Sequence, residues 1–529
     1  MRNRSLPRHL ASRLTAAVLW LIGGLCLAPV LAALAGAFWD AGHPSLAALA
    51  AAFADTARLA VLAANTLRVT LGTVAVALLI GVPLGFLGFR TDLPGRAALL
   101  LGCLLAACMP LYVTATCWMA LLGMPFWMYK TAGAAWISGI AYAPLVAWIA
   151  GVAFASGDRD LEDTAAQDSG RWGLLWHVIL PQSIWGIAMA AGVVTALCFW
   201  DITITDILMV RTFAEEVLTQ FQLGAGPPQA TAVALPAIVV AAALWAVTLR
   251  GLRRYGEAPA TGVAERPPLI RLGRWRLAVA LLAAATLVLF FVVPLAALVR
   301  TLGNPRNLVI AWRVAHAEIL ETLRVTPVAA TIVTVLATAA AWAAARQPVS
   351  RRLIHGALLL MLSVPAPAVG IGLIRLLNRP GLAGALYDSE AGLILAYIIR
   401  TLPFAVIVLI PAMRQIPRDA EDAAVLDGSN WLGVMRSVVL PCAWQAMLAA
   451  WLLAFVLSLA EMGASFLVVP PGHVTLTTRF FTLIHYGVYP DAAGVCLILV
   501  GMVGLPAAIL AALVWPRLNR AGRPRGRVG

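Results

Sequence analysis

Long apolar segments alternate with short polar segments along the whole length of the 529-residue chain. Uncharged runs such as Leu14–Trp39, Leu277–Val299 and Ala443–Ala460 reach or exceed the ~18–20 residues that a helix needs to cross a bilayer. They are too long and too continuous for the strands of a membrane barrel, and lipid offers backbone amides no other partner. The pattern therefore predicts an all-α, polytopic transmembrane helical bundle.

Charged breaks divide the apolar windows into about twelve expected spans. These lie near residues 14–38, 65–89, 97–122, 132–155, 183–209, 229–249, 277–299, 323–345, 353–374, 391–413, 442–468 and 492–515. Hydrophobic residues make up 62% of the chain and charged residues 12%, against a usual ~45–50% and ~25%. No stretch of ordinary composition is long enough to fold as a soluble catalytic domain, so we do not expect an enzyme.

The basic residues are distributed as in a membrane protein with a preferred orientation. The net charge is +14, and the 38 basic residues are arginines except for Lys130. With the N-terminus inside, 26 arginines fall in cytoplasmic segments, ten arginines and Lys130 fall in outer segments or at the outer ends of spans, and Arg400 stands within a span. Cytoplasmic loops of membrane proteins carry such an excess of positive charge, so both termini are expected to be cytoplasmic. A nucleic-acid role would instead need a basic face on a folded domain, and none is expected.

Several kinds of chemistry have no signature in this chain. A nucleotide-binding P-loop needs a lysine, and the one lysine follows Tyr129 rather than glycine. The seven cysteines lie in apolar segments without metal-ligand spacing, and the seven histidines are scattered. We therefore assign no catalytic residue, no metal ligand and no cofactor, and we expect any ATP hydrolysis to occur on partner subunits.

One polar segment occurs twice. The first copy runs from Glu162 to Trp172 and closes with Val178–Pro181; the second runs from Glu421 to Trp431 and closes with Val438–Pro441. Glu, Asp, Ala, Asp and Trp recur at a shift of 259 residues, and Leu-Pro recurs at 260. The chain is therefore expected to contain two tandem six-span repeats. The expected parts are a first half (1–250), a basic cytoplasmic linker (251–276), a second half (277–516) and a basic tail (517–529).

Each repeated segment is too polar to enter lipid and too long for a turn. Acidic residues suit the positive end of a short helix, and Gly428 can adopt a positive φ that separates two helices. We expect an exposed helix–turn–helix in each loop, able to dock into a groove of a cytoplasmic partner. The alternative is a pair of unrelated surface helices.

At these residues the sequence resembles the permeases of binding-protein-dependent, ATP-driven (ABC) importers. Their loop has the form Glu-Ala-Ala, three residues, Gly, nine residues, Ile-x-Leu-Pro, and the second copy matches this spacing. In the first copy Asp163-Thr164-Ala165 replaces the triplet, Ser169 stands where glycine is expected, and one residue is missing. The loops 158–182 and 414–441 are the expected coupling loops. Their candidate residues are Glu162, Asp163, Thr164, Ala165, Ser169, Pro181, Glu421, Asp422, Ala423, Ala424, Gly428, Leu440 and Pro441.

The single chain with two six-span halves looks like the fused permeases of the iron(III) and thiamine type. The resemblance implies a bacterial cytoplasmic membrane location, two copies of a cytoplasmic ATP-binding subunit, and a periplasmic or lipid-anchored substrate-binding protein. Membrane lipid is the remaining expected partner. Iron(III) is the expected substrate, with thiamine, phosphonates and polyamines as alternatives.

Charged residues at membrane depth are costly, so each is a candidate for function. They are Asp201, Asp206, Arg400 and Glu461. One interpretation is that they line a polar translocation path. The other is that Arg400 and Glu461 form an interhelical pair that only fixes packing.

Two other classes of protein are alternatives. A twelve-span secondary transporter also has two six-span halves, but it leaves the repeated acidic loops unexplained. A membrane transferase acting on lipid carriers would need charged residues clustered in a large outer loop, and the expected outer loops are short.

Overall fold

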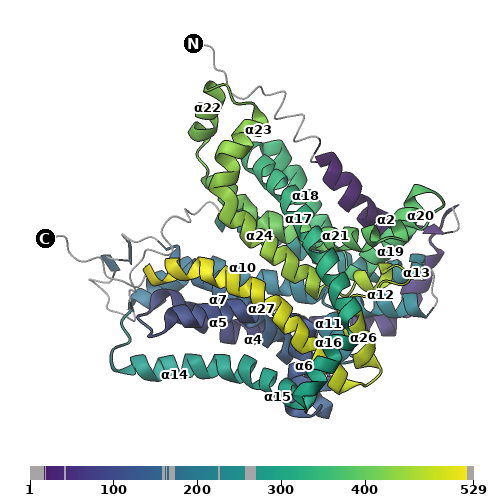
Figure 1. Ribbon diagram of the computed structural model, residues 1–529, viewed down its shortest axis with the longest axis horizontal. Helices are drawn as coiled ribbons and strands as arrows, with labels where there is room; N and C mark the ends of the chain where they lie inside the picture. Colours follow the sequence, from purple (N-terminus) through teal and green to yellow (C-terminus); the bar gives the residue numbers. More distant parts are fainter. Residues whose placement is uncertain are drawn as a thin grey trace. The chain divides into compact units, whose positions relative to one another are not determined.

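The computed structural model describes residues 17, 19–40, 43–157, 161–162, 164–165, 173–223, 227–255 and 270–520. Helices make up nearly all of this part of the chain, and the predicted all-α fold is confirmed (Figure 1). Two very short strands, β1 (Trp39–Asp40) and β2 (His43–Pro44), pair antiparallel between the first and second long helices.

The helices of the first sequence half follow the expected order. They are α2 (Ala28–Gly36) with a preceding π-helical turn (Gly23–Leu27), α3 (Ala47–Ala54), α4 (Thr56–Arg90), α5 (Arg96–Ala107), α6 (Leu111–Leu122), a 3-10 turn (Phe126–Tyr129), α7 (Thr131–Ala155), α10 (Leu180–Phe199) with a preceding π-helical turn (Leu175–Ile179), α11 (Thr203–Ile207), α12 (Phe213–Gln222) and α13 (Pro227–Tyr255).

The described part of the second sequence half is also helical. It contains a 3-10 turn (Gly273–Trp275), α14 (Arg276–Leu287), a π-helical turn (Val288–Val292), α15 (Val293–Leu302), α16 (Pro305–Val314), α17 (His316–Arg346), α18 (Pro348–Ser363), α19 (Ala366–Leu377), α20 (Leu382–Tyr387), α21 (Glu390–Gln415), α22 (Arg418–Leu426), α23 (Trp431–Val434), a π-helical turn (Met435–Val439), α24 (Leu440–Ala460), α25 (Ser465–Val468), α26 (Leu476–His485) and α27 (Tyr489–Arg520).

Ten of the described helices are long and apolar enough to cross a membrane, or twelve if two bent helix pairs each count as one span. The bent pairs occupy the expected spans 97–122 and 353–374, where α5 meets α6 at 100° and α18 meets α19 at 104°. Pro110 and Pro365 stand immediately before the second helix of each pair, in extended backbone. Proline disfavours helical backbone in the residue before it, so each of these spans is interrupted rather than continuous.

Two expected spans also end earlier than predicted. Helix α10 ends at Phe199 and α24 ends at Ala460, so Asp201, Asp206 and Glu461 lie beyond these helices rather than inside them. The short helices α11 and α25 follow instead.

Contacts between helices divide the chain into two compact units, and each unit draws residues from both sequence halves. Unit 1 holds residues 1–55, 216–242 and 316–479, and unit 2 holds residues 56–215, 243–315 and 480–529. The expected halves refer to the sequence repeat, and that division stays a prediction. Of the expected linker 251–276 the structure describes residues 251–255 and 270–276, and of the tail it describes 517–520.

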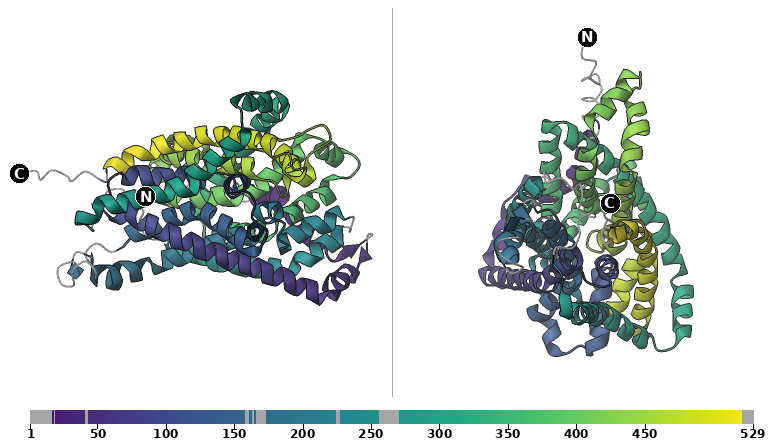
Figure 2. Two further views of the ribbon diagram at one scale, coloured as in Figure 1. Left: turned by 90° about the horizontal axis from the view of Figure 1, so that it is seen from below. Right: turned by 90° about the vertical axis from the view of Figure 1, so that its left-hand side faces the viewer.

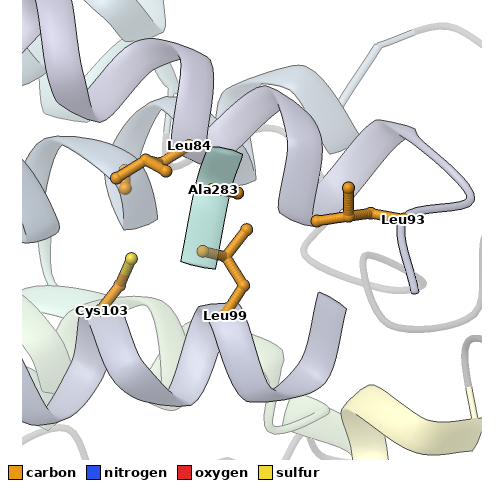
Figure 3. Close-up of a cluster of buried hydrophobic side chains, with 6 residues drawn as sticks. Leu84, Leu93, Leu99, Cys103 and Ala283 are labelled. Carbon is orange, nitrogen blue, oxygen red and sulfur yellow. The ribbon is translucent and has the colours of Figure 1, made fainter. Parts of the chain in front are cut away.

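In unit 2, the long helix α4 (purple in Figure 2) packs closely against α7. Glycines of α4 that face α7 allow this close approach. A Cβ on Gly81 would lie 2.4 Å from the Ala143 carbonyl oxygen, and one on Gly85 would lie 2.4 Å from that of Ala147. Small residues at such contacts let transmembrane helices approach closely. A buried cluster beside this contact includes side chains of α4, α5 and α14 (Figure 3). Its labelled members are Leu84, Leu93, Leu99, Cys103 and Ala283.

In unit 1, helices α17, α21 and α24 pack on one another, and α2 packs on α19 (Figure 1). Gly372 allows the α2–α19 contact, since a Cβ there would lie 2.1 Å from the Pro29 carbonyl oxygen. Val325 and Ala329 of α17 form a buried cluster with Leu393 and Tyr397 of α21. Figure 1 shows α22 and α23 at one end of this group of helices and α20 at the other.

Candidate functional site

The second repeated loop forms two short helices at an end of unit 1. Helix α22 precedes Gly428, whose φ of 89° only glycine adopts without strain, and α23 follows. The Asn430 side chain caps α23 by accepting a hydrogen bond from the Gly433 amide at 2.9 Å. The helix–turn–helix expected here is confirmed.

A buried ion pair fixes α22 to the end of α17. Glu421 is buried and accepts hydrogen bonds from Arg346, whose Nη2 lies 2.5 Å from Oε1 and whose Nε lies 3.1 Å from the same oxygen. Nη2 also donates to the Ile416 carbonyl at 3.0 Å. The rings of Trp342 and Trp431 meet edge-on at 6.2 Å and join α23 to the same helix. Both helices of the loop are thus attached to α17.

The side of the second loop that faces away from α17 is exposed. Asp422, Ala423 and Gly428 are exposed, Ala424 is half-buried, and the large apolar side chain of Leu426 is 73% exposed. Leu440 and Pro441 begin α24, which returns the chain from the loop. Helix α22 is thus fixed to α17 on one side and leaves Asp422, Ala423 and Leu426 exposed on the other.

The first repeated loop is held in the same way within unit 2. The Arg90 Nη2 lies 2.7 Å from Oε2 of Glu162, and both side chains are almost completely buried. Thr164 is exposed and Ala165 packs beside the buried cluster around Phe154, while Pro181 lies in the first turn of α10. Asp163 and Ser169 lie outside the described residues.

The sequence repeat singled out both glutamates, whose role in coupling stays a prediction, but neither arginine. Arg90 and Arg346 are the last residues of α4 and α17, 256 positions apart, whereas Glu162 and Glu421 are 259 apart. The recurrence of an arginine at the same helix end in each half is the signal that could have identified them.

Asp201 and Glu461 occupy equivalent places and act as helix caps. Asp201 accepts hydrogen bonds from the backbone amides of Thr203 at 3.0 Å and Ile204 at 3.4 Å. Glu461 accepts from the amides of Ala464 and Ser465, both at 2.8 Å. Their carboxylates therefore satisfy the first amides of α11 and α25.

Arg400 lies inside α21 and reaches the bend between α18 and α19. Its Nη1 donates to the Val364 carbonyl at 3.3 Å. Glu461 is close enough to act on it electrostatically, but the two side chains form no ion pair within 4.0 Å in the described structure. The alternative interpretation, an Arg400–Glu461 pair that fixes packing, is therefore not seen as a direct contact between these two described residues, and the role of Arg400 in a path stays a prediction.

Asp206 of α11 lies beside His485, the last residue of α26. Its Oδ2 lies 3.3 Å from the histidine Nε2, and the Nδ1 of His485 lies 2.9 Å from the Phe481 carbonyl oxygen. The Asp206 carboxylate raises the pKa of His485 above its usual value, against the opposing effect of burial. His485 was not among the predicted residues, since it comes from the other sequence half.

Comparison with known proteins places this arrangement in a family. Residues 334–520, which include the second loop, match the family described as the binding-protein-dependent transport system inner membrane component. The putrescine transport system permease PotI of Escherichia coli K12 is 30% identical over 165 residues, covering 30% of this chain and 57% of that protein. The chain thus spans little more than half the length of this relative.

Two further relatives are covered over more of their length. A Streptomyces antibioticus protein named as an ABC transporter permease, ORF1, is 31% identical over 224 residues, covering 41% of this chain and 93% of that protein. A Haloferax volcanii protein named as a probable molybdenum ABC transporter permease is 32% identical over 200 residues, covering 36% and 73%. None of these three names specifies iron(III) or thiamine. The chain belongs to the family of binding-protein-dependent ABC transporter inner-membrane permeases.

Proposed function

We propose that this chain is the permease subunit of an ATP-driven importer and that its two repeated loops each receive a separate ATP-hydrolysing subunit. The observation that carries the proposal is the buried Arg–Glu pair behind each loop, Arg90–Glu162 and Arg346–Glu421. A docked subunit would push or pull on an element that is fixed to a long helix rather than on a free loop. A periplasmic or lipid-anchored binding protein would deliver substrate at the other face.

The mechanism follows from how α22 is attached. Movement of a partner against the exposed Leu426 side would pass through Glu421 and Arg346 into α17. Helix α17 packs on α21 and α24, so the three helices would move together. Coupling of this kind is reciprocal: substrate delivery on one side should stimulate ATP hydrolysis on the other.

ATP itself would bind to the partner subunits. Lys130, the single lysine of the chain, follows the short 3-10 turn at Phe126–Tyr129 and has no glycine-rich phosphate loop before it. Its Nζ lies 4.6 Å from the centre of the Phe126 ring instead. The chemistry of hydrolysis is therefore assigned to other chains, and this chain converts it into transport.

For the substrate, iron(III) stays the prediction that the fused architecture favours. A polyamine is the second candidate, because relatives include PotI and the spermidine/putrescine permease PotC of Haemophilus influenzae, 23% identical over 169 residues. Uptake by proteoliposomes carrying the complete complex, measured with radiolabelled iron(III) and with putrescine, separates the two.

The coupling test uses the purified complex with its ATPase and binding protein in proteoliposomes. Glu421→Gln should reduce the stimulation of ATP hydrolysis by loaded binding protein by about 5- to 100-fold, because α22 loses its charged anchor. Asp419→Asn is the matched control: it removes an exposed acid from the same helix. Equal stimulation in wild type and Glu421→Gln would contradict the proposal, and uptake that continues without any ATPase would favour a secondary transporter.

A further inference from the structure

Three side chains that commonly ligate metals meet at the start of helices α17 and α21 in unit 1. Glu321 lies in the second turn of α17, Glu390 is the first residue of α21, and His473 lies between α25 and α26. One ligand atom from each of them lies within 4.8 Å of the other two. The His473 Nδ1 lies 2.7 Å from Glu321 Oε1 and 3.9 Å from Glu390 Oε1. These side chains lie at the N-terminal end of α17, whereas Arg346 is the last residue of that helix.

The neighbouring arginines do not prevent a cation from binding to these side chains. Glu318, one turn earlier in α17, is already paired with Arg479. Glu390 contacts Arg324, but the Arg324 side chain is 65% exposed and can turn into water when another cation arrives. The contact shown for the Glu321 side chain is with His473. Two carboxylates so close together repel each other unless positive charge lies between them.

We propose that Glu321, Glu390 and His473 form a binding site for one divalent transition-metal ion of the Zn²⁺ class. Two carboxylates and an imidazole are a ligand set that such ions accept, with water in the remaining position. Ligand atoms around a tetrahedral ion lie ~3.3 Å apart, given metal–ligand bonds of ~2.0–2.2 Å. To bind such an ion, the His473 Nδ1 and the Glu321 Oε1 would move slightly apart, and the Glu390 carboxylate would move closer to His473. Rotation of the side chains is sufficient for both changes. The ion would take the place of the hydrogen bond between His473 and Glu321.

The ion would connect three separate elements. It would hold the segment between α25 and α26 against the N-terminal turns of α17 and α21, adding to the contacts that Val469 and His473 already make with these helices. Sequence spacing gives no hint of the site, because Glu321 and His473 are 152 residues apart. The proposal does not depend on which substrate the chain transports.

The test uses the full chain, purified in detergent without a polyhistidine tag and freed of metal by a chelator. Titration calorimetry with ZnCl₂ should show one saturable site, and Zn²⁺ should raise the thermal unfolding temperature. Glu321→Gln and His473→Gln should each weaken Zn²⁺ binding by more than about tenfold, because each removes a direct ligand. Glu318→Gln is the matched control and should bind as wild type does.

Two results would overturn the proposal. One is the absence of saturable Zn²⁺ binding up to about 1 mM, the range of the weakest specific affinities. The other is Zn²⁺ binding that His473→Gln leaves unchanged, which would place the ion elsewhere. If Glu321→Gln does not fold, the His473 variant still decides, since its side chain is one-third exposed and its loss should not impair folding.

Discussion

The two arginine–glutamate pairs combine charges with the dipoles of the helices that carry them. Arg90 and Arg346 end α4 and α17, where the negative end of a helix favours a cation. Glu421 lies in the first turn of α22, where the positive end favours an anion. The Arg346–Glu421 pair therefore joins the end of α17 to α22, and the Arg90–Glu162 pair joins the end of α4 to the first repeated loop. Burial makes the partners of each pair depend on one another.

Removing one partner of the more buried pair should be costly. Arg90 and Glu162 are only 2% and 1% exposed, so Arg90→Gln leaves a buried carboxylate without its cation. We expect a loss of ~3–5 kcal/mol in the free energy of unfolding, measured by denaturant unfolding in detergent. The control is Arg324→Gln, which breaks a pair whose arginine is 65% exposed and should cost about 1 kcal/mol or less. Equal losses in the two variants would show that burial does not govern these pairs.

At this scale the sequence singled out residues that belong to a repeated motif, and their coupling role stays a prediction. Glu162 and Glu421 were found for that reason. Arg90 and Arg346 were missed because an arginine at a helix end also fits the general excess of cytoplasmic positive charge. Asp201 and Glu461 were expected at membrane depth, which stays a prediction; the structure adds that they accept hydrogen bonds from backbone amides at the start of α11 and α25. A carboxylate just before a short helix serves as a cap, a local role that hydropathy does not reveal.

At the scale of elements, the α4–α7 contact depends on glycine, and this gives a second mutational prediction. Gly85→Leu would place side-chain atoms against the Ala147 carbonyl, so the two helices would have to separate. We expect a loss of ~1–3 kcal/mol or more in stability, seen as a lower unfolding temperature of the purified chain. Gly501→Leu is the control, because Gly501 of α27 is exposed and a Cβ added there would meet nothing within 4 Å. The same unfolding temperature in wild type and Gly85→Leu would argue against this close contact.

Hydropathy predicted which segments are apolar helices, but not where they break. The order of spans agrees with the structure, whereas 97–122 and 353–374 are each divided at a proline. Pro110 and Pro365 differ from Pro144 and Pro403, which stand inside α7 and α21 without ending them. Whether a proline breaks a membrane helix depends on the packing around it, and packing is not visible in the sequence.

At the scale of the whole molecule, the repeat says which helices are equivalent but not which ones pack together. Helix α2 belongs to the first sequence half, yet it packs on α19 of the second half through Gly372. The compact units consequently cross the boundary between the halves. A sequence repeat indicates that two segments are equivalent. It does not indicate which helices contact one another, because those contacts join residues far apart in the sequence.

The orientation of the chain is the property on which the coupling proposal depends, and cysteine labelling can measure it. Leu426 of α22 and Leu382 of α20 are 73% and 80% exposed, and both belong to unit 1. All seven native cysteines lie among the described residues and Cys442 is the exposed one, so Cys442→Ser supplies the background. With positive charge inside, Leu426→Cys should react with a membrane-impermeant maleimide only in inverted vesicles, and Leu382→Cys only in intact cells with a permeabilised outer membrane. Labelling of Leu426→Cys in those intact cells would put α22 on the outer face, beyond the reach of a cytoplasmic ATPase. The loops could then be structural elements of the permease, but they could not transmit ATP hydrolysis.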